Sequence, residues 1–321
     1  MERKGILSLG DAFIDYVSQS SDNNCFERSL GGASVNVAVH ISRFAIPSFY
    51  LTKLGSGEDS QFVEKEMLKE KINLKDSVRT PTKQISKVYV HLDASGEREF
   101  HKYENETPNE VVLESDLKES SFENKSIFYF GSGTLFHPSA RVATKKAIEI
   151  AKEKGLIIAF DANIRIKRWN NEEECRQVIM EFLSFVDILK MSKEELLFLL
   201  EIQSVEKGLA NLEKFQIPFK LITLGEKGAI GQLYEEKVQI AGKVIKAIDT
   251  NGSGDAFMAT ILACIYEKGF PACKKEMESY IDQANRLGAI VARNVGSLPI
   301  LPDYQMIMGR AESPLLNENE V

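Results

Sequence analysis

One stretch of the sequence, DTNGSGDAF at residues 249–257, places two glycines and a serine beside two acidic residues. The apolar run from Ala256 to Lys268 that follows it ends at Gly269, which is typical of a buried helix. The turn should therefore open a helix, where unpaired backbone N–H groups and the positive end of the helix dipole favour an anion. Glycine permits a close approach of the anion to the backbone. The expected donors are the N–H groups of Gly252, Ser253 and Gly254.

Asp255 is the acidic residue expected in the first turn of this helix. Its charge would repel a bound phosphate, so its presence needs a chemical reason. A carboxylate here can accept the proton of a hydroxyl group that attacks a phosphoryl group, while the backbone donors stabilise the transferred charge. Taken alone, the motif favours a simpler interpretation, in which Asn251–Gly252 is a turn and Asp255 only caps a helix. The rest of the chain has to distinguish the two.

The composition is that of an ordinary soluble protein, with 43% hydrophobic and 27% charged residues. A net charge of −7 argues against a nucleic-acid partner. The four cysteines lie far apart without a Cys-x-x-Cys motif, which fits reduced thiols. The longest apolar segment, at 256–266, is too short to span a bilayer. We therefore expect a cytoplasmic protein with neither a nucleic-acid nor a membrane partner.

Short β-rich runs alternate with helical patterns along the chain, which indicates a mostly parallel sheet covered on both faces, a three-layer α/β/α fold. The clearest helical pattern, at 138–155, carries an apolar stripe made of Val142, Ala143, Ile148, Ile150 and Ala151. Strands are expected at 5–10, 127–131, 156–161, 187–191 and 221–225, and a further strand at 243–249 should lead into the glycine-rich turn.

One region departs from this alternation. Residues 86–103 alternate with period two on both sides of Ser95–Gly96, which predicts a β-hairpin. A second, weaker extended stretch follows the first strand. We expect these two insertions, at about 15–30 and 85–104, to form a small β-lid over the strand ends of a single domain that spans residues 1–321.

The glycine-rich motif resembles the Asp-Thr-x-Gly-Ala-Gly-Asp-x-Phe signature of the ribokinase-like (PfkB) carbohydrate kinases. GGASVNVAVHISRF at 31–44 is similar to their other signature, Gly-Gly-x-x-x-Asn-x-Ala. Further segments in family order are DANIRIKRW (161–169), KMSKEEL (190–196), TLGEKGA (223–229) and ANRLGAIVARNVGSLPILP (284–302). Because six modest matches occur together and in order, the catalytic interpretation of Asp255 is now favoured over the helix cap.

The resemblance implies a role for each matching residue. Asp255 matches the catalytic base, and the glycine-rich turn matches the anion hole. The expected sugar-binding residues are Asp15, Gly31, Gly32, Asn36, Tyr103, Asn163 and Arg165. The expected ATP-binding residues are Ser192, Glu195, Thr223, Gly225, Gly228 and Asn285. Glu195 is expected to hold Mg²⁺ through water, and Asp249 to bind a monovalent cation, K⁺.

The segments around the hairpin, at 161–169 and near residue 298 look most like the fructokinase branch of the family. This implies an ATP-dependent kinase that phosphorylates a primary hydroxyl of a ketohexose such as fructose. The alternatives are a 2-keto-3-deoxygluconate kinase or ribokinase, or a non-catalytic sensor of sugar or nucleotide on the same fold. A sensor would have no need of Asp255 as a base. Because a lid sheet with a free apolar face and edge tends to find a partner, we also expect a homodimer through the lid.

Overall fold

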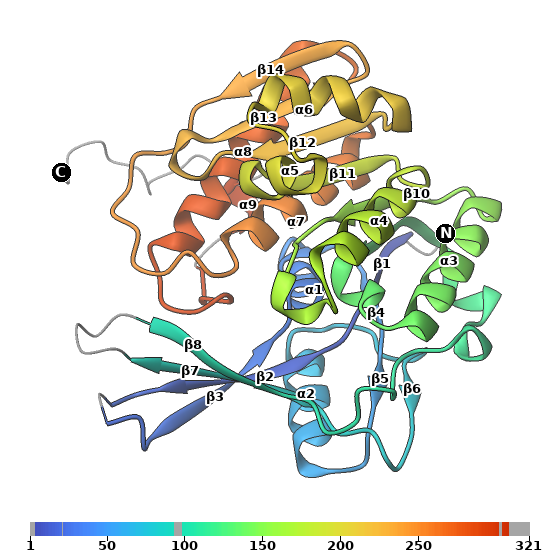
Figure 1. Ribbon diagram of the computed structural model, residues 1–321, viewed down its shortest axis with the longest axis vertical. Helices are drawn as coiled ribbons and strands as arrows, with labels where there is room; N and C mark the ends of the chain where they lie inside the picture. Colours follow the sequence, from blue (N-terminus) through green and yellow to red (C-terminus); the bar gives the residue numbers. More distant parts are fainter. Residues whose placement is uncertain (1–3, 21, 93–97, 302–303, 308–321) are drawn as a thin grey trace.

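The computed structural model is a three-layer α/β/α fold with a smaller sheet that projects from it (Figure 1). The structure describes residues 4–20, 22–92, 98–301 and 304–307. The expected turn at Ser95–Gly96 lies outside these residues. Within them, no helix has both the length and the apolar character that crossing a membrane requires.

The middle layer is an eight-stranded sheet. Its strands are β1 (Gly5–Leu9), β4 (Ser48–Leu51), β9 (Lys125–Gly131), β10 (Ile157–Asp161), β11 (Ile188–Ser192), β12 (Phe219–Thr223), β13 (Ala229–Leu233) and β14 (Glu236–Ile240). The order is β14-β13-β12-β11-β10-β9-β1-β4. The pairs β12–β13 and β13–β14 are antiparallel, and the other five pairs of this sheet are parallel. The mostly parallel sheet is thus confirmed. The chain leaves β1 for β4 on one side and builds β9 to β12 on the other, so a crevice forms at the carboxyl ends of β1 and β9.

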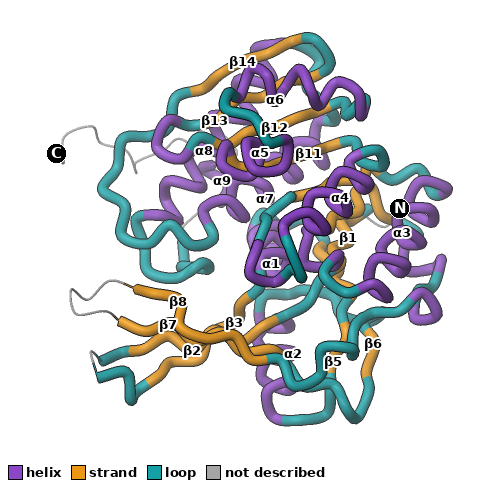
Figure 2. Tube along the Cα trace, viewed as in Figure 1, coloured by secondary structure: helices purple, strands orange, loops and turns teal. Residues whose placement is uncertain are grey.

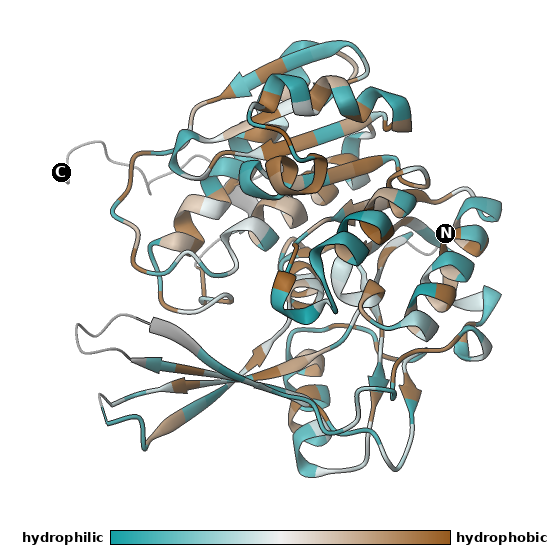
Figure 3. Cartoon of the chain, viewed as in Figure 1, coloured by the Kyte–Doolittle hydropathy of each residue, from teal (hydrophilic) through white to brown (hydrophobic). Residues whose placement is uncertain are grey.

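Helices cover both faces of this sheet (Figure 2). They are α1 (Ala33–Arg43), α3 (Pro138–Glu153), α4 (Glu172–Leu183), α5 (Lys193–Leu200), α6 (Val205–Leu212), α7 (Ser253–Lys268) and α8 (Lys274–Ala292). One face packs against α1, α7 and α8, together with the short α9 (Tyr304–Ile307), and the other against α3 to α6. The central strands are therefore mostly hydrophobic along their whole length, as Figure 3 shows.

Short 3₁₀ helices lie in the connections between these elements. They are η1 (Glu114–Asp116), η2 (Glu119–Phe122), η3 (Ser132–Leu135), η4 (Ile166–Arg168), η5 (Glu213–Phe215) and η6 (Gly225–Lys227). Two of them come next after β9 and β10 in the chain: η3 follows β9 directly, and η4 follows β10 after a short connection. Both therefore lie near the carboxyl ends of these strands, where the crevice opens.

The helix α3 forms where its pattern predicts it, with one exception. Ala143, Ile148 and Ala151 are buried, whereas Val142 is 52% exposed. Successive helical residues point about 100° apart, so Val142 cannot share a narrow stripe with its neighbour Ala143. The helix begins at Pro138, a residue suited to the first helical position.

The predicted strand at 243–249 is wrong. This segment crosses as irregular backbone from β14 to α7, and its Val244 is fully exposed. The N–H groups of Ile248 and Asp249 instead donate to the Ala292 carbonyl at the end of α8, at 2.8 and 3.2 Å. The apolar residues of this segment were misleading: they come in two adjacent pairs, Val244–Ile245 and Ala247–Ile248, and no described strand pairs with the segment.

The smaller sheet contains β2 (Phe13–Ser18), β3 (Phe26–Gly31), β7 (Ser86–Leu92) and β8 (Arg98–Glu104), in the order β3-β2-β7-β8. Figure 1 shows it reaching away from the main body below α7 and α8. One of its faces packs near its base against α2 (Glu58–Lys69), where Lys87 pairs with Asp59 at 2.9 Å. The opposite face carries Asp15. That this sheet closes over the site as a lid stays a prediction.

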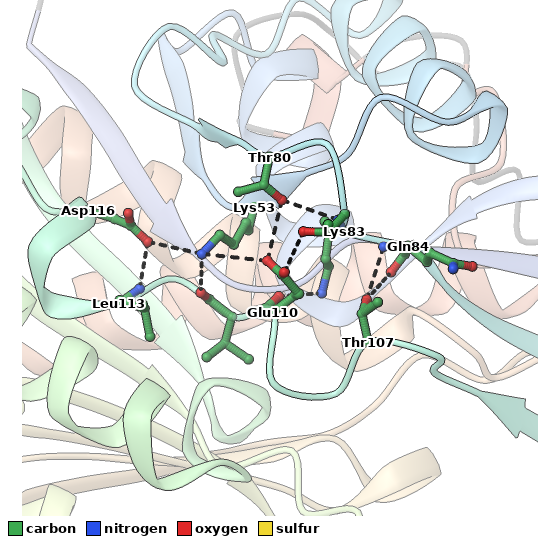
Figure 4. Close-up of polar contacts among 10 residues, drawn as sticks. Lys53, Thr80, Lys83, Gln84, Thr107, Glu110, Leu113 and Asp116 are labelled. Carbon is green, nitrogen blue, oxygen red and sulfur yellow. Dashed lines mark hydrogen bonds and ion pairs between the residues drawn. The ribbon is translucent and has the colours of Figure 1, made fainter.

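A buried lysine begins a polar network at the base of this sheet (Figure 4). Lys53, in the short strand β5 (Lys53–Leu54) that pairs with β6 (Val78–Arg79), has a side chain that is only 7% exposed. Its Nζ donates to the Val111 carbonyl at 3.1 Å and to the Asp116 carboxylate at 3.4 Å. Glu110 lies 3.9 Å from the same nitrogen.

The network continues to both ends of the β7–β8 hairpin. Thr80 and Thr82 donate to the Glu110 carboxylate, and Lys83 Nζ donates to the Glu110 carbonyl at 2.7 Å. Residues 80–83 precede β7 and Glu110 follows β8 (Figure 4), so these bonds fasten the two feet of the hairpin to each other and, through Lys53, to the main body.

Replacing Lys53 with methionine should lower the free energy of unfolding by about 2–3 kcal/mol, because the carboxylates of Asp116 and Glu110 lose a desolvated cation while the packing volume is kept. Chemical denaturation measures the change. The matched control is Lys69→Met, which removes an ammonium that is 57% exposed and paired with Glu66. That change should cost less than about 1 kcal/mol. Equal losses in the two variants would contradict the structural role of Lys53.

Candidate active site

Asp255 lies in the first turn of α7, where that helix meets α1 and the sheet edge. Asn36 in α1 donates from Nδ2 to Asp255 Oδ2 at 2.8 Å, although 219 residues separate the two. The Asp255 side chain is largely buried, and burial raises its pKa, partly offset by Asn36, Lys190 and Arg165. No donor among the described residues contacts the other oxygen, Oδ1. The carboxylate is therefore held by one oxygen and can accept a proton on the other.

The turn before α7 has the backbone form of an anion site. Gly252 has φ of +78°, and a Cβ there would lie 2.6 Å from Ser297 Cβ, so only glycine fits. Over the described part of the chain, the N–H groups of Gly252 and Gly254 have no acceptor. Ser253, in contrast, donates both its N–H and its hydroxyl to the Thr250 carbonyl, at 3.3 and 2.8 Å. Two of the three expected donors therefore remain available for an anion.

Asp249 connects this turn to the loop after α8. One carboxylate oxygen accepts from Asn251 N at 3.0 Å, and the other accepts from Gly296 N at 3.0 Å. Asp249 is buried, and the Ser297 hydroxyl in the same loop lies 3.3 Å from Asn36 Oδ1. Two segments far apart in the sequence thus fix the shape of the turn.

A buried ion pair lies directly below the turn, and the sequence analysis missed it. Lys190 Nζ is 3.0 and 3.1 Å from the two carboxylate oxygens of Asp161, and both side chains are buried. The two residues are register partners at the ends of β11 and β10. A Cβ on Gly254 would lie 2.9 Å from Lys190 Nζ, so the ammonium lies against the first turn of α7.

The charges around Lys190 decide its protonation state. Burial alone would lower the pKa of Lys190, but the carboxylates of Asp161, Glu195 and Asp255 outweigh this effect and raise it. The site therefore contains a permanent positive charge. A sequence signal was present, because Lys190 interrupts an otherwise apolar buried strand, where a lone charge needs a partner.

The expected sugar-binding residues of the first 36 positions lie together. Gly31 packs under the Asp15 carboxylate, where a Cβ would lie 2.4 Å from Asp15 Oδ2. Gly32 has φ of +114° and lies against the Asp11 carbonyl. Burial raises the pKa of Asp15 to about 6. Because α1 begins directly after Gly32 and carries Asn36, these residues are continuous with Asp255.

The three other expected sugar-binding residues lie on other elements than the group around Gly31 and Asn36. Tyr103 in β8 donates its hydroxyl to Ser86 Oγ at 3.0 Å, on the same face of the smaller sheet as Asp15. Asn163, with φ of +33°, follows the end of β10. Arg165 is exposed, and it contributes to the electrostatic environment of Asp255.

Ser192 and Glu195 form a capping box at the start of α5. Ser192 Oγ accepts from Glu195 N at 3.1 Å, and Glu195 Oε2 accepts from Ser192 N at 2.7 Å. Glu195 Oε1 accepts from Ile164 N at 2.7 Å, which brings the end of β10 beside α5. Each carboxylate oxygen keeps one lone pair, so Glu195 can still accept a hydrogen bond from a metal-bound water.

The remaining expected nucleotide residues form a second group beside β12, β13 and α8. Gly225 and Gly228 have φ of +62° and +90° in the turn after Thr223, and a Cβ on Gly228 would lie 2.0 Å from the Ile240 carbonyl. Asn285 Nδ2 donates to the Ile240 and Ala241 carbonyls, both at 3.3 Å. Gly228 and Asn285 therefore meet at the chain that leaves β14.

The described residues contain no group of three or more His, Cys, Asp or Glu side chains that could hold a metal ion by themselves. A Mg²⁺ ion commonly keeps several waters and binds through one or two carboxylates together with substrate phosphates. The single carboxylate of Glu195 fits that arrangement and not a metal site made by protein alone.

The chain matches the pfkB family carbohydrate kinase over residues 3–303. The fructokinase of Vibrio alginolyticus is 30% identical over 293 residues, 91% of this chain and 94% of that protein. A crystal structure of the fructokinase from Vibrio cholerae O395, bound to fructose, ADP and calcium ion, is 28% identical with a TM-score of 0.83, and the match covers 96% of this chain and 99% of that chain. A double mutant of that enzyme, bound to fructose, ADP and potassium ion, is 28% identical with a TM-score of 0.83, over 97% and 100% of the two chains.

Replacing Asp15 with asparagine should stabilise the sugar-free protein near neutral pH, and this gain should disappear in acid. The folded-state pKa of about 6 lies above the ordinary value of 3.8, so ionisation of this carboxyl group opposes folding. The opposition is absent below pH 3.8 and complete above pH 6. Thermal unfolding of both proteins across this pH range measures it.

The control is Asp22→Asn on the connection between β2 and β3. Hydrogen bonds from Ser20 and Asn24 lower the pKa of Asp22, so its ionisation favours folding and the substitution should destabilise at neutral pH. This loss should fade as the pH falls through the Asp22 pKa. A pH-independent effect of Asp15→Asn would show that its carboxyl group is not held in a desolvated place.

Proposed function

Because the chain belongs to the pfkB family of carbohydrate kinases, we propose that it transfers the γ-phosphoryl group of ATP to a primary hydroxyl of a ketohexose, with fructose as the first candidate. The observation that carries this proposal is the pairing of Asp255 with Asn36 beside two unoccupied backbone donors at the start of α7. Support for the sugar comes from the fructokinases that match more than nine-tenths of the chain.

The geometry assigns a role to each part of the turn. The sugar hydroxyl gives its proton to Asp255 Oδ1 while its oxygen bonds to the γ-phosphorus. The bond from that phosphorus to the bridging oxygen breaks, and ADP leaves. The N–H groups of Gly252 and Gly254 stabilise charge on the transferred group, and the Lys190 ammonium below them adds a fixed positive charge. Burial raises the pKa of Asp255, which suits a base that must later release its proton.

Two cations fit this chain. Mg²⁺, held by the nucleotide phosphates, would be reached through water by Glu195, and it supplies charge neutralisation when bound. A monovalent cation, K⁺, would lie beside Asp249 and the loop at 293–297, with backbone carbonyls as its other proposed ligands. A potassium ion occurs in the structure of the related fructokinase double mutant.

The nucleotide would lie along α8 and the loop after β14. Large apolar side chains are exposed in this loop and in the loop after α8, which the hydrogen bonds to Ala292 hold together. They are Val244, Ile248, Val295 and Ile300. The loop after β14 begins at the Ala241 carbonyl that Asn285 contacts, so its exposed apolar side chains would be available to pack against an adenine base.

The smaller sheet is proposed to close over the sugar and to join two subunits. Its inner face carries Asp15 and Tyr103. Its outer face carries an aromatic cluster in which Tyr16 and Tyr89 stack at 5.0 Å and Phe26 meets Tyr89 edge-on at 5.8 Å. Such a cluster on a projecting sheet is a suitable contact for a second copy of this chain.

An assay of ADP release with fructose, ribose, 2-keto-3-deoxygluconate and adenosine tests the proposed function. We expect the highest kcat/KM with fructose. In Asp255→Asn, kcat should fall about 10²- to 10⁴-fold with little change in fructose affinity, because only the proton acceptor is removed. Higher kcat/KM for another acceptor would overturn the assignment of fructose. An Asp255→Asn enzyme with nearly full activity would overturn the catalytic role.

K⁺ should raise kcat more than Na⁺ does, with little effect on the KM for fructose. A cation beside Asp249 would orient the N–H groups of the turn, and loss of one such donor lowers kcat by about 10²-fold in other enzymes. Dialysed enzyme is assayed in K⁺, Na⁺ and a bulky organic cation at equal ionic strength. The variant Asp249→Asn should lose the response to K⁺. Equal rates in all three salts would show that the turn keeps its shape without a cation.

A further inference from the structure

Arg168, in η4 after β10, lies between the main body and the smaller sheet. Its guanidinium carbon is 3.9 Å from the centre of the Tyr103 ring, 4.7 Å from that of Phe136 and 5.7 Å from that of Phe13. Tyr103 and Phe13 belong to β8 and β2, whereas Phe136 follows η3. Three aromatic faces from both parts of the molecule thus surround one cation.

Arg168 differs from the other described arginines that contact aromatic rings, because each of those also pairs with a carboxylate. Arg28 pairs with Asp59, Arg141 with Glu174 and Arg176 with Glu172. Over the described residues, no hydrogen bond or ion pair reaches the guanidinium of Arg168. Its side chain is half-buried, and burial lowers its pKa. A guanidinium that has lost water without gaining an acceptor has donors left for a ligand.

The position of Arg168 shows where such a ligand would lie. Asp15 in β2 is the register partner of Val88 in β7, and Val88 is the partner of Tyr103, so Asp15 and Tyr103 are in one row on one face. Phe13, two residues from Asp15, is on that face as well. Arg168 therefore faces the part of the smaller sheet that carries the expected sugar-binding carboxylate.

We propose that Arg168 is a specificity-determining residue that donates hydrogen bonds to oxygen atoms of the acceptor sugar on the side of the smaller sheet. This inference rests on the proposed function of the same site. Asp15 accepts hydrogen bonds from sugar hydroxyl groups, and Arg168 donates hydrogen bonds to sugar oxygen atoms. The two side chains together therefore contact the sugar both as acceptor and as donor. The aromatic rings hold the plane of the guanidinium. The Asp11 carboxylate partly offsets the effect of burial on the pKa of Arg168, but no ion pair joins the two among the described residues, so the guanidinium keeps donors for a sugar carboxylate, which it binds more strongly than a hydroxyl group.

The test compares Arg168→Gln with the wild type. Fructose affinity is measured by calorimetry without ATP, and kcat and both KM values are measured by ADP release. We expect the Kd and KM for fructose to rise about 10- to 100-fold, the usual cost of a lost charged hydrogen bond, with the KM for ATP unchanged. A sugar acid, 2-keto-3-deoxygluconate, measured as substrate or competitive inhibitor, should lose more affinity than fructose does. Because calorimetry needs no turnover, this result is independent of whether fructose is phosphorylated.

The matched control is Arg176→Gln, which removes an arginine in α4 that lies 4.6 Å from the Phe198 ring and pairs with Glu172 in α4 and with Glu201 at the end of α5. It should leave fructose affinity unchanged. Arg168→Lys keeps the charge without the planar group and should give an intermediate affinity. Thermal unfolding checks that each variant is folded. An unchanged fructose Kd in folded Arg168→Gln and Arg168→Lys would overturn the proposal, and equal losses for fructose and the sugar acid would overturn its charge preference.

Discussion

The Lys190 ammonium is the charge on which the arrangement of the site depends. Asp161, Asp255 and Glu195 bring three carboxylates to one buried edge of the sheet, and all three raise the pKa of Lys190. Without this cation, the carboxylates would repel one another and would also repel a phosphate at the adjacent turn. With it, Asp161 holds the ammonium in place from β10, and a positive charge lies between the carboxylate of the proposed base, Asp255, and its acidic neighbours. The ion pair is thus a condition for the proposed arrangement, in which a base lies beside an anion hole.

The smaller sheet depends on a different kind of constraint, because its base is fixed and its outer part is not packed on the main body. Lys53 and Glu110 fasten both feet of the β7–β8 hairpin through buried and half-buried polar bonds. Nearer the site, Arg168 contacts Tyr103 and Phe13 only through their ring faces. Cation–π contacts tolerate small shifts better than directional hydrogen bonds do. This arrangement suits the proposed closure of the sheet over the sugar, because the anchor lies at the base of the sheet.

The sequence predicted those features that follow from local patterns. Alternating apolar runs located β1, β9, β10, β11 and β12, and glycines with acidic neighbours located the turn before α7. It could not predict features that depend on contacts across the chain. Residues 243–249 are apolar enough for a strand but pair with no described strand, and Arg168 looks no different from Arg165 until the fold places Tyr103 against it. The partner of Lys190 was equally invisible, since 29 residues separate it from Asp161.

The helix α1 connects the parts of the candidate site that lie far apart in the sequence. It begins directly after Gly31, which packs under Asp15, and Gly32, and one turn later Asn36 holds Asp255. Near its end, Arg43 donates to the Pro299 carbonyl at 2.7 Å, in the loop whose Ser297 packs against Gly252. A single rigid element thus contacts the expected sugar-binding residues, the proposed base and the loop that supports the proposed anion hole. Because a helix moves as a body, we expect a shift of α1 to change all three together, and so to couple the proposed sugar site to the shape of the turn before α7.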